Sequence, residues 1–127
     1  MRLLIDTHTV IWFINANSRL PQHIRVMLED ESNDVYVSMI SLWELSIKSR
    51  LGKLDLNRSL ADIVDLLHEN GFQFLPVLLD HVFCLDTLEL HHRDPFDRML
   101  IAQALADGFD IVGCDDVFDR YGVRRLW

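Results

Sequence analysis

Short apolar runs alternate with longer segments of helical periodicity along the whole chain. Strands are predicted at residues 3–5, 35–37, 72–75, 110–112 and 122–125, and helices at 7–14, 40–50, 80–88 and 96–106, with two further helices opened by Pro21 and Ser59. The helix over 96–106 is apolar nearly all round and should be central. This alternation predicts an α/β fold with a mostly parallel five-stranded sheet covered on both faces. No repeat or linker interrupts it, so we expect one domain over residues 1–127.

The bulk properties are those of a globular protein. Half of the residues are hydrophobic and a quarter are charged. No apolar run approaches the roughly 20 residues that cross a bilayer, and a charge interrupts the N-terminal apolar segment too early for a secretion signal. We therefore expect a cytoplasmic protein with no membrane partner. Cys84 and Cys114 match neither a disulfide framework nor zinc spacing, and we expect both to be small buried residues.

The formal net charge is −8, from 12 basic and 20 acidic residues. Passive nucleic-acid binding favours a basic surface, so this balance counts against a simple binding module. Divalent cations bound to a cluster of acids would reverse the charge locally. The charge is therefore compatible with a metal-dependent enzyme that acts on nucleic acid.

Acidic side chains occur where the predicted strands end, and ligands of open α/β sheets bind at that edge. The acids are Asp6 after the first strand, Glu44 in the helix after the second, Asp94 and Asp97 at the start of the central helix, and Asp115 and Asp116 after the fourth strand. The central helix leads into the fourth strand, so its N-terminus should lie at the same edge. Four separate segments thus bring carboxylates to one rim.

Each acid also has a purely structural interpretation. Asp6 and Asp115 are suitable helix caps, and Asp94 with Pro95 is a typical helix start. The pattern Ser41-x-x-Glu44 matches a capping box, and Glu44 could instead pair with Lys48 one turn later. Taken singly, each acid is more often a cap than a ligand.

The combination favours a metal site. Glu44 shares its predicted helix stripe with the apolar residues Ile40, Ile47 and Leu51, and Asp97 shares one with Ile101 and Leu105. Buried carboxylates are costly unless they are paired or bind metal, and clustered carboxylates repel one another. Oxygen ligands select Mg²⁺ or Mn²⁺. The six histidines are scattered, so zinc is not expected.

Carboxylates with Mg²⁺ suit displacement at phosphorus. The chain has no glycine-rich phosphate loop and no G-x-S-x-G motif, which counts against triphosphate hydrolysis and acyl transfer. A phosphodiester is the remaining substrate class. Its backbone could contact basic residues near the rim, although each of these could equally be an ordinary solvated residue: Lys48, Arg50, Lys53, Arg93 and Arg98.

The chain resembles PIN-domain ribonucleases, in particular the VapC-type toxins of bacterial toxin–antitoxin pairs. The matching segments are LLIDTHTVIW, VSMISLWELSIKSRLGKL, HHRDPFDRMLIAQA and GCDDVFDRYGV, in this order from Met1 to the C-terminus. The resemblance implies a PIN-like three-layer α/β/α sandwich. It also implies an endoribonuclease that uses Mg²⁺ or Mn²⁺, usually dimerises and is inhibited by a VapB-type antitoxin.

The resemblance also assigns roles to individual residues. The acidic quartet that binds the metal and activates water matches Asp6, Glu44, Asp97 and Asp115; Asp94 matches an additional acid beside the site, Thr7 and Ser41 match nearby polar residues, and Arg98 matches an arginine suggested to position substrate. Asp116, next to Asp115, is the alternative candidate for the fourth acid of the quartet. We prefer Asp115, because Phe118 then keeps the family spacing.

One departure from the family pattern concerns Gly113, since the family usually has Thr or Ser two positions before the fourth acid. Two other functions remain to be weighed. A phosphatase of the HAD type needs a second acid two residues after Asp6, where this chain has His8. A non-catalytic PIN fold that only binds RNA or protein would be expected to lose acids of the quartet.

Overall fold

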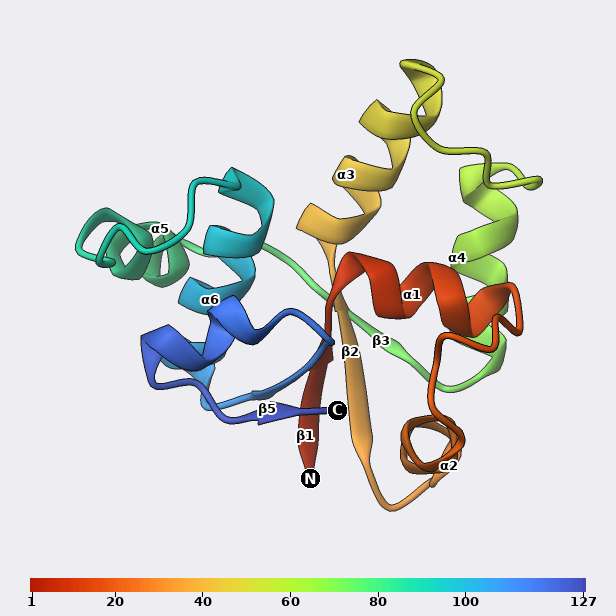
Figure 1. Cartoon of the computed structure of the whole chain (residues 1–127), viewed down its shortest axis with the longest axis horizontal. Helices are drawn as coiled ribbons and strands as arrows, with labels where there is room; N and C mark the ends of the chain where they lie inside the picture. The colour runs from red at the N-terminus through yellow and green to blue at the C-terminus, as the bar shows by residue number, and fades with distance from the viewer.

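The computed structural model describes residues 1–127. The strands are β1 (Arg2–Ile5), β2 (Asp34–Ser38), β3 (Gln73–Leu75), β4 (Asp110–Val112) and β5 (Arg125–Leu126), and the helices are α1 (Thr7–Ile14), α2 (Gln22–Glu29), α3 (Met39–Arg50), α4 (Leu60–Glu69), α5 (Leu79–Asp86), α6 (Pro95–Asp107) and the 3₁₀-helix η1 (Asp116–Tyr121). All strand pairs are parallel, in the order β3-β2-β1-β4-β5 (Figure 1). The predicted five-stranded sheet is confirmed.

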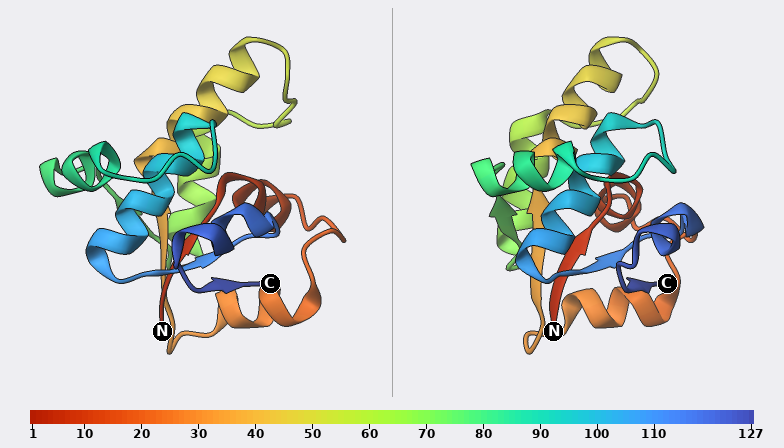
Figure 2. Two further views of the ribbon diagram at one scale, coloured as in Figure 1. Left: turned by 60° about the vertical axis from the view of Figure 1, so that its left-hand side comes forward. Right: turned by 90° about the vertical axis from the view of Figure 1, so that its left-hand side faces the viewer.

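The sheet separates two hydrophobic cores. Along β1, Leu3 and Ile5 point into one core with residues of α1, α2 and α4, whereas Leu4 points into the other with residues of α6 and η1. Successive side chains of a strand point to opposite faces, so a strand that is apolar at every position needs cover on both sides. Figure 2 shows α5 and α6 on one side of β1 and β2, with α1 and α2 on the other. The three-layer α/β/α arrangement is thereby confirmed.

The central helix α6 is buried as predicted, with its residues 99–104 all buried. The Asp94 side chain caps its start by accepting a hydrogen bond from the Phe96 amide at 2.8 Å, and Pro95 occupies the first turn. Gly108 ends the helix in a left-handed conformation with φ of 75°. None of the helices combines the length and apolar character needed to cross a bilayer.

Two predictions from the sequence are wrong in detail. The last strand covers Arg125–Leu126 instead of 122–125, because Gly122 with φ of 72° ends η1 and the chain reaches the sheet only where Arg125 lies opposite Ile111. Neither cysteine is fully buried: Cys84 is half-buried and Cys114 is exposed. Cys114 lies in the turn after β4, outside both cores.

The N-termini of three helices lie at the carboxyl edge of the sheet. Helix α1 follows β1 directly, α3 follows β2 directly, and α6 runs back along the sheet before β4, so its N-terminus lies at this edge (Figure 1). The parallel register keeps the strand ends level, since Ile5 lies opposite both Val37 and Val112.

Candidate metal centre at the carboxyl edge of the sheet

Asp6 extends the pairing of β1 and caps α1. Its amide donates to the Val112 carbonyl at 3.0 Å. Its Oδ1 accepts hydrogen bonds from the Thr9 amide at 2.9 Å and the Thr9 hydroxyl at 2.6 Å. The cap interpretation is therefore correct, yet Oδ2 has no protein donor. Asp6 is only 3% exposed, so these contacts fix one oxygen and leave the other without a protein donor.

Glu44 projects from α3 and is also 3% exposed. Its Oε1 accepts from the Thr7 hydroxyl at 2.6 Å, and its Oε2 accepts from the Lys48 ammonium at 2.5 Å. Thr7 also contacts the Ser41 hydroxyl at 3.1 Å. Both polar residues predicted near the site thus surround Glu44. The capping-box interpretation is wrong, because α3 begins at Met39 with Ser38 as its cap, which places Ser41 inside the helix.

Asp94, Asp97 and His92 form a compact group at the start of α6. One potential ligand atom from each lies within 4.8 Å of the others. The Asp94 Oδ1 caps the helix, and the His92 ring nitrogen Nε2 donates to the Asp97 Oδ2 at 2.8 Å. The second oxygen of each aspartate has no protein donor. The sequence gives no signal for His92, which is separated from the DPFDR motif by Arg93.

The Arg98 guanidinium is bonded to the segment before α6. Its guanidinium donates to the backbone carbonyls of Leu88 at 3.2 Å and Glu89 at 2.9 Å. The Tyr121 hydroxyl accepts from the amides of His91 and His92 at 2.9 Å and 2.8 Å. Together, Arg98 and Tyr121 fix the segment that carries His92, which in turn orients Asp97.

The remaining acids lie after β4. The Asp115 Oδ1 caps η1 by accepting from the Val117 amide at 3.0 Å, while Asp115 and Asp116 are both exposed. Asp115 therefore has one unbonded oxygen, as Asp6, Asp94 and Asp97 do. The compact group at α6 includes neither Asp115 nor Asp116.

The predicted apolar stripes are only partly correct. On α6, Ile101 lies one turn after Asp97 and is fully buried, but Leu105 is 41% exposed. Near the end of α3, Leu51 is 63% exposed. Glu44 is instead buried beside Ser41 and Leu45. Its burial comes from its position against α1, since both helices begin at the same sheet edge.

Two carboxylates of the centre, Asp6 and Asp97, have raised pKa values. Burial, together with the charges of Asp94 and Asp6, raises the pKa of Asp97 to about 6, although the His92 hydrogen bond lowers it. Burial also raises the pKa of Asp6, with a further contribution from Glu44 and opposition from the Thr9 hydrogen bonds. The charge of Glu44 acts on Asp6 and the charge of Asp6 acts on Asp97, so carboxylates from segments far apart in sequence lie near one another at this edge.

Comparison with known proteins identifies the fold family. The PIN domain family model matches residues 3–124. The chain belongs to the PIN domain family. A search of curated proteins gave no significant match.

Solved structures of similar fold include two VapBC structures and FitAcB. The VapBC2 complex of Rickettsia felis bound to a DNA fragment from their promoter matches with a TM-score of 0.76 and 16% identity, covering 99% of this chain and 98% of that chain. DNA-bound VapBC from Salmonella typhimurium matches with a TM-score of 0.76 and 21% identity, covering 99% and 97%. FitAcB from Neisseria gonorrhoeae matches with a TM-score of 0.63 and 22% identity, covering 98% and 96%.

Gly113 explains the departure of this PIN domain from the family pattern. A Cβ atom at this position would lie 2.7 Å from the Asp6 Oδ2 and 3.2 Å from the Phe118 ring. The Asp6 carboxylate therefore occupies the space that a side chain at position 113 would need.

Gly113→Ala is expected to displace the Asp6 carboxylate, to lower the free energy of unfolding by about 1–3 kcal/mol and to weaken Mn²⁺ binding. Denaturant unfolding and Mn²⁺ titration would measure the two effects. Gly108→Ala is the matched control, since its Cβ meets open space and only its φ of 75° is strained. Equal loss of Mn²⁺ affinity in both variants would contradict the role of Gly113.

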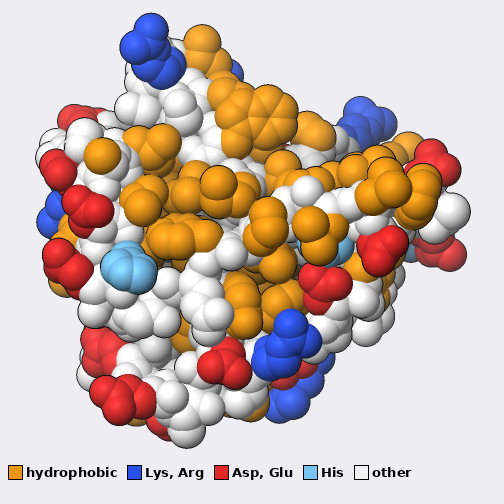
Figure 3. Space-filling model, turned by 180° about the vertical axis from the view of Figure 1, so that it is seen from behind, with side chains coloured by type: hydrophobic (Ala, Val, Ile, Leu, Met, Phe, Trp, Pro, Cys, Tyr) orange, Lys and Arg blue, Asp and Glu red, His pale blue; other side chains and the backbone are white.

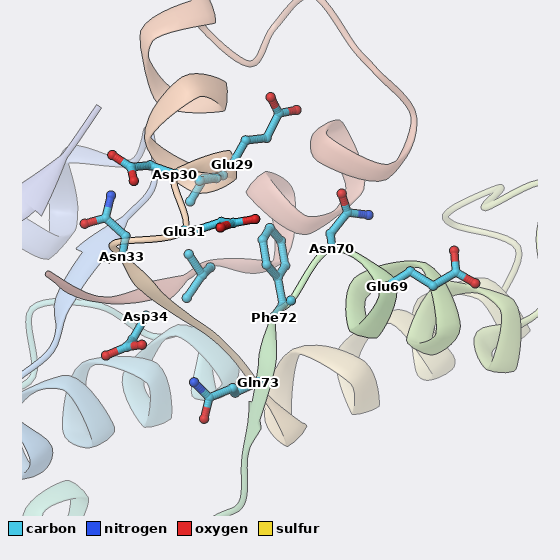
Figure 4. Close-up of a pocket in the computed structure, with 12 residues that line it drawn as sticks. Glu29, Asp30, Glu31, Asn33, Asp34, Glu69, Asn70, Phe72 and Gln73 are labelled. Atoms are coloured by element: carbon cyan, nitrogen blue, oxygen red, sulfur yellow. The ribbon is translucent and has the colours of Figure 1, made fainter.

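The largest cavity in the structure is separate from this centre. It has a volume of about 520 Å³ and lies at the opposite edge of the sheet, before β2 and β3 (Figure 4). Acidic and amide side chains surround it, including Glu29, Glu31 and Glu69. Asp30 is already bonded to Ser32 there. No convergent buried polar group marks this cavity as a site.

Proposed function

We propose that this PIN domain is an endoribonuclease that depends on Mg²⁺ or Mn²⁺ and acts as a VapC-type toxin paired with a VapB-type antitoxin. The convergence of buried carboxylates with raised pKa values at the carboxyl edge of the sheet carries this proposal. The similarity in fold to chains of VapBC complexes supports the pairing.

The residues present fit a hard divalent cation. Asp6, Asp94, Asp97 and Asp115 each keep one oxygen free of protein donors, and oxygen-rich sites favour Mg²⁺ or Mn²⁺. We propose that Asp6, Glu44, Asp97 and Asp115 hold the ion, with Asp94 beside them. A bound ion would supply positive charge that assists water attack and stabilises the leaving oxygen.

The protein's own contribution is to hold these oxygens in place. Thr9 holds Asp6 through two hydrogen bonds, and His92 holds Asp97 through one. The donors bind one oxygen of each carboxylate, so the other keeps a fixed direction without reorganisation. RNA phosphates could contact Lys48, Arg50 and Lys53 at the end of α3. The acidic centre would suit basic residues of an antitoxin.

The experiment that tests the function is cleavage of total RNA by the purified protein with Mn²⁺, with Mg²⁺ or with EDTA. Cleavage that requires a divalent ion and is stopped by EDTA supports the proposal. If the protein binds RNA in every buffer without cutting it, the non-catalytic binding function replaces the nuclease.

We further propose that two copies associate through the apolar surface over α3 and α5. Exposed hydrophobic side chains gather there, including Trp43, Leu79, Phe83 and Leu90, which are 58%, 67%, 61% and 77% exposed. Figure 3 shows a broad band of hydrophobic side chains across this face. Within it lies a cavity of about 220 Å³ lined by Ile40, Trp43, Leu85, Pro95, Phe96 and Met99. Such a continuous patch is typical of an interface.

Phe83→Glu is expected to convert a dimer into a monomer, because it places a charge within the proposed interface. Light scattering during gel filtration should give twice 14.9 kDa for the unmodified chain and 14.9 kDa for the variant. Val26→Glu is the control, since Val26 is 57% exposed on α2, in the opposite layer. A monomeric unmodified chain would refute this surface.

A further inference from the structure

Lys48 is the basic residue that is bonded to a carboxylate of the acidic centre. It follows Glu44 by one turn of α3, and its ammonium lies 2.5 Å from the Glu44 Oε2. The Glu44 side chain is 4% exposed and that of Lys48 is 36% exposed. The pair therefore joins a buried carboxylate to an ammonium whose stem reaches the surface.

Glu44 differs from the other carboxylates of the centre because both of its oxygens are bonded. Thr7 donates to Oε1 and Lys48 to Oε2. Each carboxylate oxygen has more than one lone pair, so an ion can approach Glu44 while both donors stay, but a cation at Oε2 would repel the Lys48 ammonium. Thr7 is buried and is held by the start of α1, whereas Lys48 is on a flexible stem. Lys48 is thus the donor that can leave.

Two arginines near the centre are bonded to other groups. Arg98 donates to backbone carbonyls of the segment before α6. Arg125 pairs with Asp119 through two hydrogen bonds of 3.0 Å. The charges of Glu44, Asp94 and Asp97 all act on Lys48 and raise its pKa, the hydrogen bond to Glu44 most strongly. Its ammonium therefore faces the carboxylates at the site itself.

We propose that Lys48 binds the RNA phosphodiester at the centre, and that Glu44 retains the ammonium until a divalent ion binds. This inference rests on the nuclease function proposed above. Without metal, Lys48 neutralises Glu44 and prevents an uncompensated buried charge. With metal bound, the ammonium turns toward the phosphate, for which it supplies a point charge. No bond forms or breaks in this exchange.

The proposal requires Mn²⁺ affinity and RNA affinity to change in opposite directions. Lys48→Met removes the competitor for Glu44, so the Kd for Mn²⁺, measured by electron paramagnetic resonance of the free ion, should fall several-fold. RNA binding should weaken, and the slope of log affinity against log salt should decrease by about 0.7, as for one lost phosphate contact on a single strand. The probe is a fluorescent single-stranded RNA of mixed sequence, with Ca²⁺ present.

Lys48→Arg should restore RNA binding and its salt dependence, which a merely structural role would not require. Arg19→Met is the control for general loss of charge, since Arg19 is exposed in the turn between α1 and α2. Circular dichroism would establish that each variant is folded, and Lys48→Gln replaces Lys48→Met if the latter is not.

Two results separate the possible failures. If the unmodified chain binds Mn²⁺ and cuts RNA, but Lys48→Met matches Arg19→Met in both affinities, Lys48 is only an exposed partner of Glu44 and the inference is overturned. Weaker Mn²⁺ binding in Lys48→Met would overturn it as well. If the unmodified chain neither binds Mn²⁺ nor cuts RNA, the nuclease proposal fails and this inference fails with it.

Discussion

Asp97→Asn is expected to reduce RNA cleavage by at least about 100-fold, because it removes a proposed ligand charge while preserving the shape of the side chain. The same variant should raise the Tm of the metal-free protein at neutral pH. Asp97 has a pKa of about 6 as a result of burial and of the charges of Asp94 and Asp6, so its ionised form destabilises the fold. A neutral amide relieves that repulsion.

A loss of cleavage together with a rise in Tm would distinguish the loss of a metal ligand from unfolding of the variant. Cleavage of total RNA in Mn²⁺ measures the first effect, and thermal unfolding in EDTA measures the second. Asp62→Asn provides the control, because Asp62 is exposed on α4. Cleavage by Asp97→Asn at the rate of the unmodified chain would show that the centre lies elsewhere.

Mn²⁺ is expected to raise the Tm, with a larger increase at about pH 7.5 than at about pH 5, because protons compete with the ion for the carboxylates. The pKa of Asp97 is raised from 3.8 to about 6. The folded state therefore binds this proton more tightly than the unfolded state. Its contribution to stability is present below pH 3.8 and is lost as the pH rises through about 6. Above about pH 6, a bound ion would supply the positive charge that the proton supplies at lower pH.

An ion present at 100 times its Kd would stabilise the fold by about 2.7 kcal/mol. Thermal unfolding over a range of pH, with Mn²⁺ and with EDTA, measures the effect. Asp97→Asn should show a smaller Mn²⁺ shift and a flatter dependence on pH. A shift of equal size at both pH values would contradict proton competition at this carboxylate.

Local patterns predicted the sheet and the positions of most acids. Leu3, Leu4 and Ile5 are apolar at consecutive positions, which is typical of a strand buried on both faces, and β1 is the central strand. The start of α6 was predicted equally well, because a cap such as Asp94 with Pro95 acts within one turn of helix.

Contacts between distant segments could not be predicted in this way. The Tyr121 hydroxyl reaches the segment before α6 from η1, and nothing in the spacing of these residues indicates the contact. His92 has no recognisable pattern in the sequence, because metal-binding histidines are recognised by their paired spacing. This single histidine instead bonds to one carboxylate, Asp97. Thr9 could have been found, since a threonine three residues after a capping aspartate is suitably placed to donate to it.

The order of strands has a consequence during synthesis of the chain. The central strand β1 is made first, but one of its two partners, β4, is made after more than a hundred residues. Asp6 acquires its contacts with Val112 and Gly113 only then. Long-range pairing of this kind forms late, because loop closure must precede it. A nascent chain released before β4 would have no assembled centre, so premature termination would yield fragments without it.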